Sequence, residues 1–494
     1  MHEPQEPRLI GGYIGVHVGS ANTRVARFNE AGQAEITLNR EGSTSTPSVV
    51  QIDDNGDTII GQEAKKFLGC GIPNVFAEFK REMGTEKSWP VAGKSVTPID
   101  LSALLLKKVV SDYAEQFGQP QSVVITWPAN YRNEQREATK QAAARAGLRV
   151  VHYIEEATAA AIYFSSDKAL VGKYLVYDFG GGTFNVTLIE AHGNSINVLY
   201  QDGVQQLGGK DLDLALLKII GDKFRAKTGD EFDEVDCGFD KVSKESAKHT
   251  LSIKDKTQIR LVSGKHGPIP IDISRDEFEA GISHLISQAE MACENVLRCG
   301  KEDPSQHVKK SDIKEIFMAG STSRVPAMQA SVERLFGKKP MVKNPDQAIA
   351  MGAAIYAAYR QRNTLSPHQA RGIANVTIVN KVSPHYLGIT YNDWLTGESY
   401  NRIIFPKGTM IPCRKQFTIT ADAHGCLPPI HINQSAIEEL NLDFVTTIWE
   451  AEFPKGPAYG KHELSLGYHD DGTIFCRVVR EADGWAIGMD LSPD

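Results

Sequence analysis

The stretch "YLVYDFGGGTFNVTLIE", residues 174 to 190, sets the first expectation for the fold. An apolar run leads into a turn with three glycines, and a second run of alternating apolar and polar residues follows, which predicts two strands joined by a turn. The stretch "YIGVHVGSANTRVARF", residues 13 to 28, has the same outline. It carries His17 just before its turn, at the place where the later copy carries Asp178.

The two copies lie within one long region of mixed character. Residues 11 to about 362 alternate strand-like and helix-like segments, as α/β proteins do. For example, "SVVITWPANY" reads as a strand, and "NEQREATKQAAARAGL" predicts a helix with Asn133 as its N-cap and Gly147 as its C-cap. The alanine-rich "NPDQAIAMGAAIYAAYRQ", residues 344 to 361, predicts another helix. Two related hairpins half of such a region apart suggest two similar lobes that face each other. A chance likeness of two glycine turns is the alternative.

The composition of the chain changes after residue 362. Residues 362 to 381 are polar with proline and glycine, which predicts a linker, and from Val382 short β-like stretches alternate with turns, which predicts an all-β sandwich. We therefore expect an N-terminal extension at 1–11, an α/β domain at 12–361, a linker at 362–381 and an all-β domain at 382–494. We expect no helical segment after that domain.

Overall composition narrows the functional classes. The net charge of −7 gives no general electrostatic case for nucleic acid binding. The first ten residues lack the pattern of a secretory signal, and no run approaches the roughly 18 apolar residues of a membrane span. The seven cysteines are scattered without a C-x-x-C pair, which suits a reducing compartment. We expect a cytoplasmic protein that binds neither nucleic acid nor membrane directly.

Several glycine-rich turns point to phosphate binding. They are the triple glycine at 180–182, "QLGGKDLD" at 206–213 and "MAGSTSRVP" at 318–326, with the hydroxyl residues Ser20, Thr183 and Thr322 beside the turns. Glycine lets backbone N–H groups approach an anion closely. The chain has neither a G-x-x-x-x-G-K-[ST] motif nor a G-x-G-x-x-G motif after its first strand, so neither a P-loop nor a dinucleotide fold is indicated. Each turn alone is a weak signal, since ordinary turns also use glycine.

Seven ordered segments resemble the signatures of the 70-kilodalton heat-shock chaperone family. They are "IGVHVGSAN", "VITWPANYRNEQREATKQAAARAGL", "IEEATAAAIYF", "LVYDFGGGTFNV", "LGGKDLD", "GSTSRVP" and "NPDQAIAMGAA". The resemblance runs from about residue 12 to the end of the chain. It implies an actin-like, two-lobed ATPase domain with ATP in the cleft. It also implies a β-sandwich peptide-binding domain, to which "VSPHYLGI" and "FPKGTMIP" are similar.

The resemblance implies roles for individual residues. Lys80 matches the lysine that positions the attacking water, and Glu156, Asp178 and Thr183 match catalytic or phosphate-side positions. Asp178 also matches a carboxylate near hydrated magnesium. The positions that match the nucleotide-binding turns and the adenosine pocket are Gly19, Ser20, Ala21, Asn22, Gly180, Gly181, Gly182, Gly208, Gly209, Glu245, Lys248, Ser252, Gly320, Arg324 and Asp346.

The resemblance also implies regulation and partners. Pro128 and Arg136 match positions that relay the nucleotide state to the other domain. ATP and magnesium are the implied cofactors. The implied partners are a J-domain co-chaperone, a nucleotide-exchange factor and unfolded polypeptide. The ribosome is a further implied partner, because short members of the family act with a J-domain protein at the ribosome.

The chain departs from the family pattern at the reaction centre. His17 and Asn185 replace two aspartates that lie near the magnesium and the reacting phosphate. Neutral imidazole and amide groups accept hydrogen bonds but supply no negative charge, and magnesium prefers oxygen ligands. With Asp178 and Glu156 left, magnesium–ATP could still bind, but we expect slow hydrolysis. The alternative is that His17 is tolerated and turnover is only modestly reduced.

Other departures lie around the pocket and beyond it. Ala21, Ala157, His249 and Ser321 replace a threonine, a proline, an adenine-stacking arginine and a glycine of the family pattern. The linker ends in "VTIVNK", with fewer apolar residues than the family and a lysine in place of an acid. The segment "CLPPIHIN" places two prolines in an expected groove strand, where proline removes ladder donors. These departures argue against peptide capture driven by ATP. The alternative is that the loops have diverged in sequence without a functional effect.

Three hypotheses follow. The first is a divergent chaperone of this family that binds ATP, assists protein folding and hydrolyses ATP weakly. The second is a non-catalytic, ribosome-associated partner of a J-domain protein in which ATP is structural and the β domain is a docking surface; some such members also carry "IGVH" at the first turn. The third is a small-molecule kinase on the same fold, which the C-terminal β region argues against.

Overall fold

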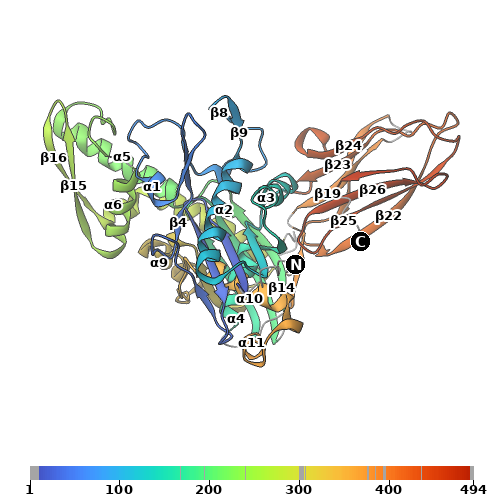
Figure 1. The fold of residues 1–494 in the computed structure, drawn as a ribbon, viewed down its shortest axis with the longest axis horizontal. Coiled ribbons are helices and arrows are strands. Elements are labelled where there is room, and N and C mark those ends of the chain that lie inside the picture. The colour runs from blue at the N-terminus through green and yellow to red at the C-terminus, as the bar shows by residue number, and fades with distance from the viewer. Residues whose placement is uncertain are drawn as a thin grey trace, which may run out of the picture.

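The structure is a computed structural model that describes residues 11–166, 169–193, 195–239, 241–299, 305, 307–374, 378–383, 385–392, 397–435 and 437–489. It has mixed α/β content with several sheets, as expected (Figure 1). The expected N-terminal extension lies outside the described residues except for Gly11. None of the helices in the described ranges combines the length and the apolar content that crossing a membrane requires.

The first six-stranded sheet contains the hairpin of residues 13 to 28. Its strand order is β11-β10-β1-β2-β3, and β4 also pairs with β2. The strands are β1 (Tyr13–Val18), β2 (Asn22–Phe28), β3 (Ala34–Ile36), β4 (Thr46–Pro47), β10 (Ser122–Trp127) and β11 (Val150–Glu155). The strand β1 runs antiparallel to β2 and parallel to β10.

The second six-stranded sheet contains the hairpin of residues 174 to 190. Its order is β17-β12-β13-β14-β18-β21. The strands are β12 (Leu170–Phe179), β13 (Phe184–Gly193), β14 (Ser195–Val204), β17 (Ile313–Ala319), β18 (Ile378–Val382) and β21 (Met410–Ile411). The strand β12 runs antiparallel to β13 and parallel to β17, so both predicted hairpins are confirmed and each has a parallel strand on its other side.

Two helices lie between the two large sheets. They are α4 (Glu156–Ser165) and α10 (Ala348–Arg360), and their alanines share one core with residues of both sheets. The two helices are very close, because a Cβ added at Gly352 would lie 1.7 Å from the carbonyl oxygen of Ala159. The alanine-rich segment predicted as a helix is therefore α10, and its small residues allow the layers to approach.

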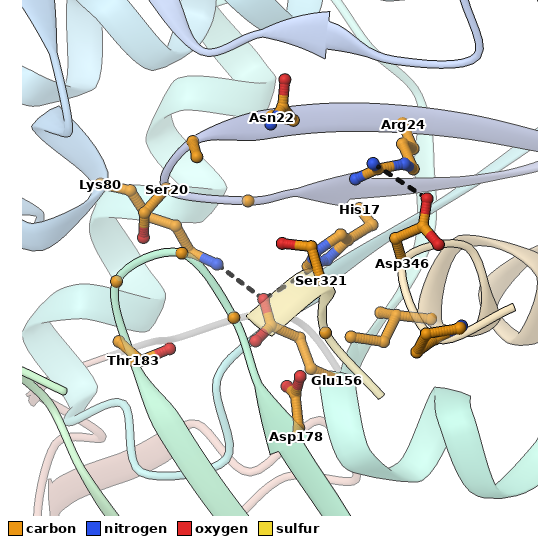
Figure 2. Close-up of a pocket in the computed structure, with 18 residues that line it drawn as sticks. His17, Ser20, Asn22, Arg24, Lys80, Glu156, Asp178, Thr183, Ser321 and Asp346 are labelled. Carbon is orange, nitrogen blue, oxygen red and sulfur yellow. Dashed lines mark hydrogen bonds and ion pairs between the residues drawn. The ribbon is translucent and has the colours of Figure 1, made fainter. Parts of the chain in front are cut away.

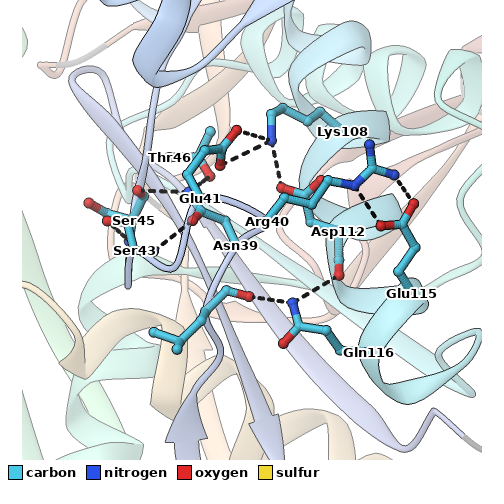
Figure 3. Close-up of polar contacts among 11 residues, drawn as sticks. Asn39, Arg40, Glu41, Ser43, Ser45, Thr46, Lys108, Asp112, Glu115 and Gln116 are labelled. Carbon is cyan, nitrogen blue, oxygen red and sulfur yellow. Dashed lines mark hydrogen bonds and ion pairs between the residues drawn. The ribbon is translucent and has the colours of Figure 1, made fainter.

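The outer face of the first sheet is covered by α2 (Pro98–Phe117) and α3 (Asn133–Arg145), which pack apolar residues against β1 and β10. Figure 3 shows how α2 also fixes the loop between β3 and β4. Lys108 lies 2.6 Å from Asp112 and 3.1 Å from Glu41, and Gln116 donates to the Leu38 carbonyl at 2.8 Å. This loop leads into β4 and forms part of a cavity wall described below.

The other helices and small sheets complete the two sides. The elements packed near the second sheet are α5 (Gly209–Thr228), α6 (Lys241–Ile253), α7 (Arg275–Gly281), α8 (Ser283–Arg298), α9 (Pro326–Phe336), β15 (Lys256–Ser263) and β16 (Gly267–Ser274). Those near the first are α1 (Gln62–Lys65), the 3₁₀ turn η1 (Phe79–Glu82), β5 (Val49–Ile52), β6 (Thr58–Ile60), β7 (Val75–Ala77), β8 (Trp89–Val91) and β9 (Lys94–Val96).

The segment expected to be a linker contains the 3₁₀ turn η5 (Arg362–Thr364), a helix and a strand. Helix α11 (Pro367–Gly372) begins at the Ser366 N-cap, whose hydroxyl accepts a hydrogen bond from the Gln369 amide. Strand β18 then adds to the edge of β14 in parallel, with Ile196 opposite Val379. The C-terminal part of this segment is therefore part of the second sheet, and it pairs on its other side with β21.

Two four-stranded antiparallel sheets follow and share a core of aliphatic and aromatic residues. Their strands are β19 (Tyr386–Asn392), β20 (Ser399–Phe405), β22 (Cys413–Thr420), β23 (Ile430–Ser435), β24 (Thr446–Ala451), β25 (Lys461–Tyr468), β26 (Ile474–Arg480) and β27 (Ala486–Met489). Pro428 and Pro429 precede β23 rather than lying inside it, which corrects the expectation, because the strand starts only where backbone donors are present again. In Figure 1 these sheets lie beside α3.

Candidate nucleotide-binding site

The turns of the two hairpins meet between the large sheets and line a small cavity of about 40 Å³ (Figure 2). It continues into a larger cavity of about 690 Å³. The predicted residues that line the small cavity are Gly19, Ser20, Ala21, Asn22, Lys80, Glu156, Asp178, Gly180, Gly181, Gly182, Thr183, Gly320 and Asp346. Those that line the larger one are Ser20, Ala21, Asn22, Gly181, Gly209, Glu245, Lys248, Ser252, Arg324 and Asp346.

The glycine turns hold one another in place. The amides of Gly209 and Lys210 donate to the carbonyls of Gly180 and Gly181, both at 3.0 Å. Gly208 lines neither cavity but lies directly behind them, because a Cβ there would be 2.4 Å from the Gly182 nitrogen. Within the described residues, the Gly181 and Gly182 amides donate to no other backbone group. Successive N–H groups presented in this way form an anion-binding nest.

An ion pair lies at the centre of the small cavity. Lys80, on η1, places Nζ 2.6 Å from Oε1 of Glu156, the first residue of α4, and both side chains are buried. The same oxygen is 3.5 Å from His17 Nδ1, and His17 Nδ1 also shares a hydrogen bond of 3.0 Å with Thr126 Oγ1. Burial, followed by the charges of Lys80 and Arg24, holds the pKa of His17 well below its usual range. The imidazole is therefore neutral at pH 7.

The second hairpin contributes Asp178, which lies opposite Asn185 in the β12–β13 ladder. Burial, with the nearby Glu156 charge adding to it, raises the pKa of Asp178 to about 8, although Lys80 acts in the opposite direction. Asn185 is buried, and neither atom of its amide group has a hydrogen-bond partner among the described residues. The position next to Asp178 thus carries a polar group without charge.

Sequence reasoning missed Arg24, which lines both cavities. It stands opposite His17 in the β1–β2 ladder, and its guanidinium donates to Asp346 at 3.2 Å. Arg324 binds the other oxygen of Asp346 at 2.5 Å. A signal for Arg24 was available, because residues two apart on a strand share a face and Asn22 was already placed at the site.

The larger cavity has α6 as one wall. Lys248 donates to the Gly209 carbonyl at 2.9 Å and lies 2.8 Å from Asp213 Oδ1, which fixes its side chain. Ser252 and His249 also line this cavity, and burial lowers the pKa of His249, so its ring is neutral at pH 7. A neutral ring on the cavity wall can stack against a planar ligand.

Besides Arg24 and Asp346, further ion pairs among the described residues bridge the two sides of the cleft, and local sequence patterns predicted none of them. Lys65 of α1 lies 2.5 Å from Glu245 of α6. Arg81 of η1 lies 3.0 Å from Asp211 of α5 and also donates to the Gly182 carbonyl at 2.7 Å. The third pair joins Glu78 to Lys210 at 2.5 Å. The two sides of the cleft are thus joined by pairs whose members are distant in sequence.

Pro128 and Arg136 lie away from both cavities, at the junction with the C-terminal sheets. Pro128 is buried directly after β10. Arg136 is 1% exposed, and it donates to the backbone carbonyls of Tyr131 at 3.2 Å and Asp471 at 2.6 Å. The Asp471 carboxylate is 3.2 Å from Lys140 on the same helix. A continuous set of contacts therefore leads from β10 to the turn between β25 and β26.

Asn133 was expected to cap α3, and this is wrong. The helix begins at Asn133 itself and the capping position is Arg132. The amide oxygen of Asn133 instead accepts a hydrogen bond of 3.0 Å from the Ile474 amide in β26. The Asn133 side chain, which the local sequence would assign to capping the helix, thus contacts the C-terminal sheets instead.

Comparison with known proteins agrees with this geometry. The Hsp70 protein family model matches residues 13–94 and 88–440. The chaperone proteins DnaK of Thermotoga petrophila and Thermotoga maritima are 35% identical to this chain over 423 residues, which are 83% of the chain and 68% of each relative. The DnaK chaperone of Thermosipho melanesiensis is 32% identical over 422 residues, with the same coverage. The chain belongs to the Hsp70 family of ATP-binding chaperones and is of the DnaK type.

Proposed function

We propose that this chaperone binds ATP in the cleft, with the phosphates on the glycine turns and the adenosine in the larger cavity. The small cavity supports this because nest-forming amides and Lys80 face it, and anions bind such groups. Glu245, Lys248, His249 and Ser252 would contact adenosine from α6. Arg324 and Asp346 would enclose it from the other side, whereas Gly320, expected at the same wall, lines only the small cavity.

We also propose the domain layout of the family. Residues 12–361 would form a two-lobed, actin-like nucleotide-binding domain, and 382–494 a β-sandwich that takes unfolded polypeptide, with 362–381 between them. The paired large sheets and the pair of four-stranded sheets support this division. Pro128 and Arg136 would relay the nucleotide state, since Arg136 contacts Asp471 directly.

Magnesium is the family's usual companion of ATP, and this site suits it poorly. Glu156 is already paired with Lys80, and His17 and Asn185 offer no charge. No cluster of three or more potential metal ligands occurs in the described part of the chain. Asp178 is the carboxylate that would face the hydration shell of a bound cation, but burial favours its protonated form. Magnesium usually needs one or two carboxylates in addition to phosphates.

Slow hydrolysis follows from this electrostatic arrangement. In phosphoryl transfer the protein contributes mainly positioning and charge stabilisation. Lys80 would position the attacking water and Thr183 would contact the transferred phosphate. The observation that carries the proposal is that His17, which lies just before the turn proposed to hold the phosphates and 3.5 Å from Glu156, supplies no negative charge there. We propose that hydrolysis is weaker than a site with two further carboxylates would support.

Single-turnover hydrolysis of pre-bound labelled ATP tests this proposal. Wild type, His17→Asp and Asp178→Asn would be compared in magnesium-containing buffer, and Asp178→Asn controls for a contaminating ATPase. We expect stable binding with slow turnover in wild type, faster turnover in His17→Asp and none in Asp178→Asn. Fast wild-type turnover that His17→Asp leaves unchanged contradicts the role of His17. Failure of all three proteins to retain ATP contradicts nucleotide binding itself.

Partners and location are proposed from the family. A J-domain co-chaperone and a nucleotide-exchange factor would act on the nucleotide-binding domain, and the scattered cysteines suit the cytoplasm. The matches to DnaK chaperones do not favour the alternative of a non-catalytic, ribosome-associated partner protein. Suppression of aggregation of an unfolded client, measured with and without ATP, separates the two, since only a chaperone depends on nucleotide in this assay.

A further inference from the structure

Arg24 places a positive charge in the cleft on the strand next to His17. It stands directly opposite His17 in the β1–β2 ladder and lines both the small and the large cavity. Only 12% of its side chain is exposed, and its Nε has no hydrogen-bond partner among the described residues. In Figure 2 its guanidinium lies between the phosphate-side turn and Asp346. An arginine held in this way keeps its charge and has donors to spare.

The neighbouring anion does not fully neutralise the positive charge of Arg24. Asp346 is shared, because Arg24 takes one carboxylate oxygen and Arg324 the other. Two cations therefore share a single anion at the rim of the small cavity. Deeper inside, Lys80 is matched by Glu156. The rim around Arg24 therefore presents more positive than negative charge without any metal.

We infer that Arg24 is a built-in counter-ion for the nucleotide phosphates, so that nucleotide binding by this chain does not require a divalent cation. The inference rests on the proposed ATP binding and deepens it. Guanidinium groups bind phosphate oxygens through paired, charge-assisted hydrogen bonds, and these strengthen where water is excluded. The chain thus combines two uncharged residues, His17 and Asn185, where a metal would need carboxylates, with a fixed cation, Arg24, on the strand next to His17.

The metal dependence of affinity tests this inference. The full-length chain would be titrated calorimetrically with a non-hydrolysable ATP analogue, once in excess magnesium and once in excess EDTA. We expect the two dissociation constants of wild type to agree within about threefold. Arg24→Gln should weaken binding in EDTA by about 10- to 100-fold, the loss expected for a charged hydrogen bond. Arg24→Lys keeps the charge but loses the paired donors of the guanidinium. Its dissociation constant in EDTA should lie between those of wild type and Arg24→Gln.

Controls keep the result interpretable. Arg27→Ala, on the opposite face of the same strand and paired with Glu35, should bind like wild type in both buffers. Removal of Arg24 leaves Asp346 with Arg324 as a partner, so we expect the variants to fold, and circular dichroism checks this. The double variant His17→Asp/Arg24→Gln should gain metal dependence and bind at least about tenfold more tightly with magnesium than with EDTA, a gain that misfolding cannot produce.

Each remaining outcome counts against one specific claim. Wild type that binds the analogue only with magnesium overturns the role of Arg24 and leaves the proposed ATP binding intact. Equal affinity of wild type and Arg24→Gln in EDTA also overturns that role. No binding in either buffer contradicts the proposed function itself, so the two failures are distinguishable.

Discussion

Lys80 and Glu156 form a buried ion pair in the cleft, with Nζ 2.6 Å from Oε1. Lys80 is 9% exposed and Glu156 is 3% exposed, so each is the other's main compensation for lost hydration. The pair joins η1 to the first residue of α4, and it places a cation and an anion within one phosphate-sized cavity. Its geometry also explains why Glu156 is not free to serve a metal.

Breaking this pair from either side should destabilise the protein strongly. Lys80→Met or Glu156→Gln leaves one uncompensated buried charge, which costs about 3–5 kcal/mol. The double variant removes both charges and should recover most of that loss. Urea unfolding of nucleotide-free protein measures the coupling through a double-mutant cycle. The exposed pair Lys66–Glu63 is the matched control and should contribute less than about 1 kcal/mol. Single variants as stable as wild type would show that the pair is not buried in solution.

The raised pKa of Asp178 predicts a pH-dependent stability with a definite sign. In the folded protein its pKa is about 8, against about 4 in an unfolded chain. Between these values the folded state binds a proton that the unfolded state has lost, so wild-type stability falls as pH rises, by up to about 1.4 kcal/mol per pH unit. Asp178→Asn removes the titrating carboxyl group and with it this loss of stability at higher pH.

The measurement is the free energy of unfolding of both proteins in EDTA without nucleotide. The free energy of unfolding of Asp178→Asn should exceed that of wild type only slightly near the unfolded pKa of the carboxyl group. The difference should grow to a few kcal/mol by about pH 8. An advantage that stays constant across this window would show that the carboxyl is ionised in the folded state throughout.

The contact between α4 and α10 should tolerate no added methyl group. Gly352→Ala would bring a Cβ to 1.7 Å from the Ala159 carbonyl, which forces the two helices apart in the core between the sheets. We expect a loss of at least about 3 kcal/mol, as for severe overpacking. Gly238→Ala, at a turn with positive φ and nothing within 4 Å of the new Cβ, should cost only about 1 kcal/mol. Equal thermal midpoints of the two variants would contradict this packing.

Arg136 should hold the C-terminal sheets against α3. Arg136→Ala removes donors to Tyr131 and Asp471 and leaves those buried carbonyls unsatisfied. We expect thermal unfolding to separate into two transitions and protease to cut more readily between residues 378 and 383. Lys140→Ala, which removes the partly exposed pairs with Asp471 and Glu137 and a hydrogen bond to Thr473, should have a smaller effect. A single unchanged transition in Arg136→Ala would show that this contact does not couple the two parts.

Local sequence patterns predicted much of the framework. Both glycine hairpins, the alanine-rich helix that became α10 and the series of short C-terminal strands follow from periodicity and turn residues, which act over a few positions. Helix ends and segment roles were less predictable. Asn133 bonds to Ile474 rather than capping its helix, and the polar segment after residue 362 contains β18, because partners far along the chain supply the missing contacts.

The chemistry open to the turns could be predicted from the residues. Glycine at the turns is visible in the sequence, and the resemblance to the family shows that His17 and Asn185 replace two carboxylates. How the charges of the site are balanced became clear from the folded chain. Arg24 meets Asp346, Lys65 meets Glu245 and Arg136 meets Asp471 across more than a hundred residues of chain. Electrostatic interaction depends on distance in space and on burial, and neither can be read from the order of residues along the chain.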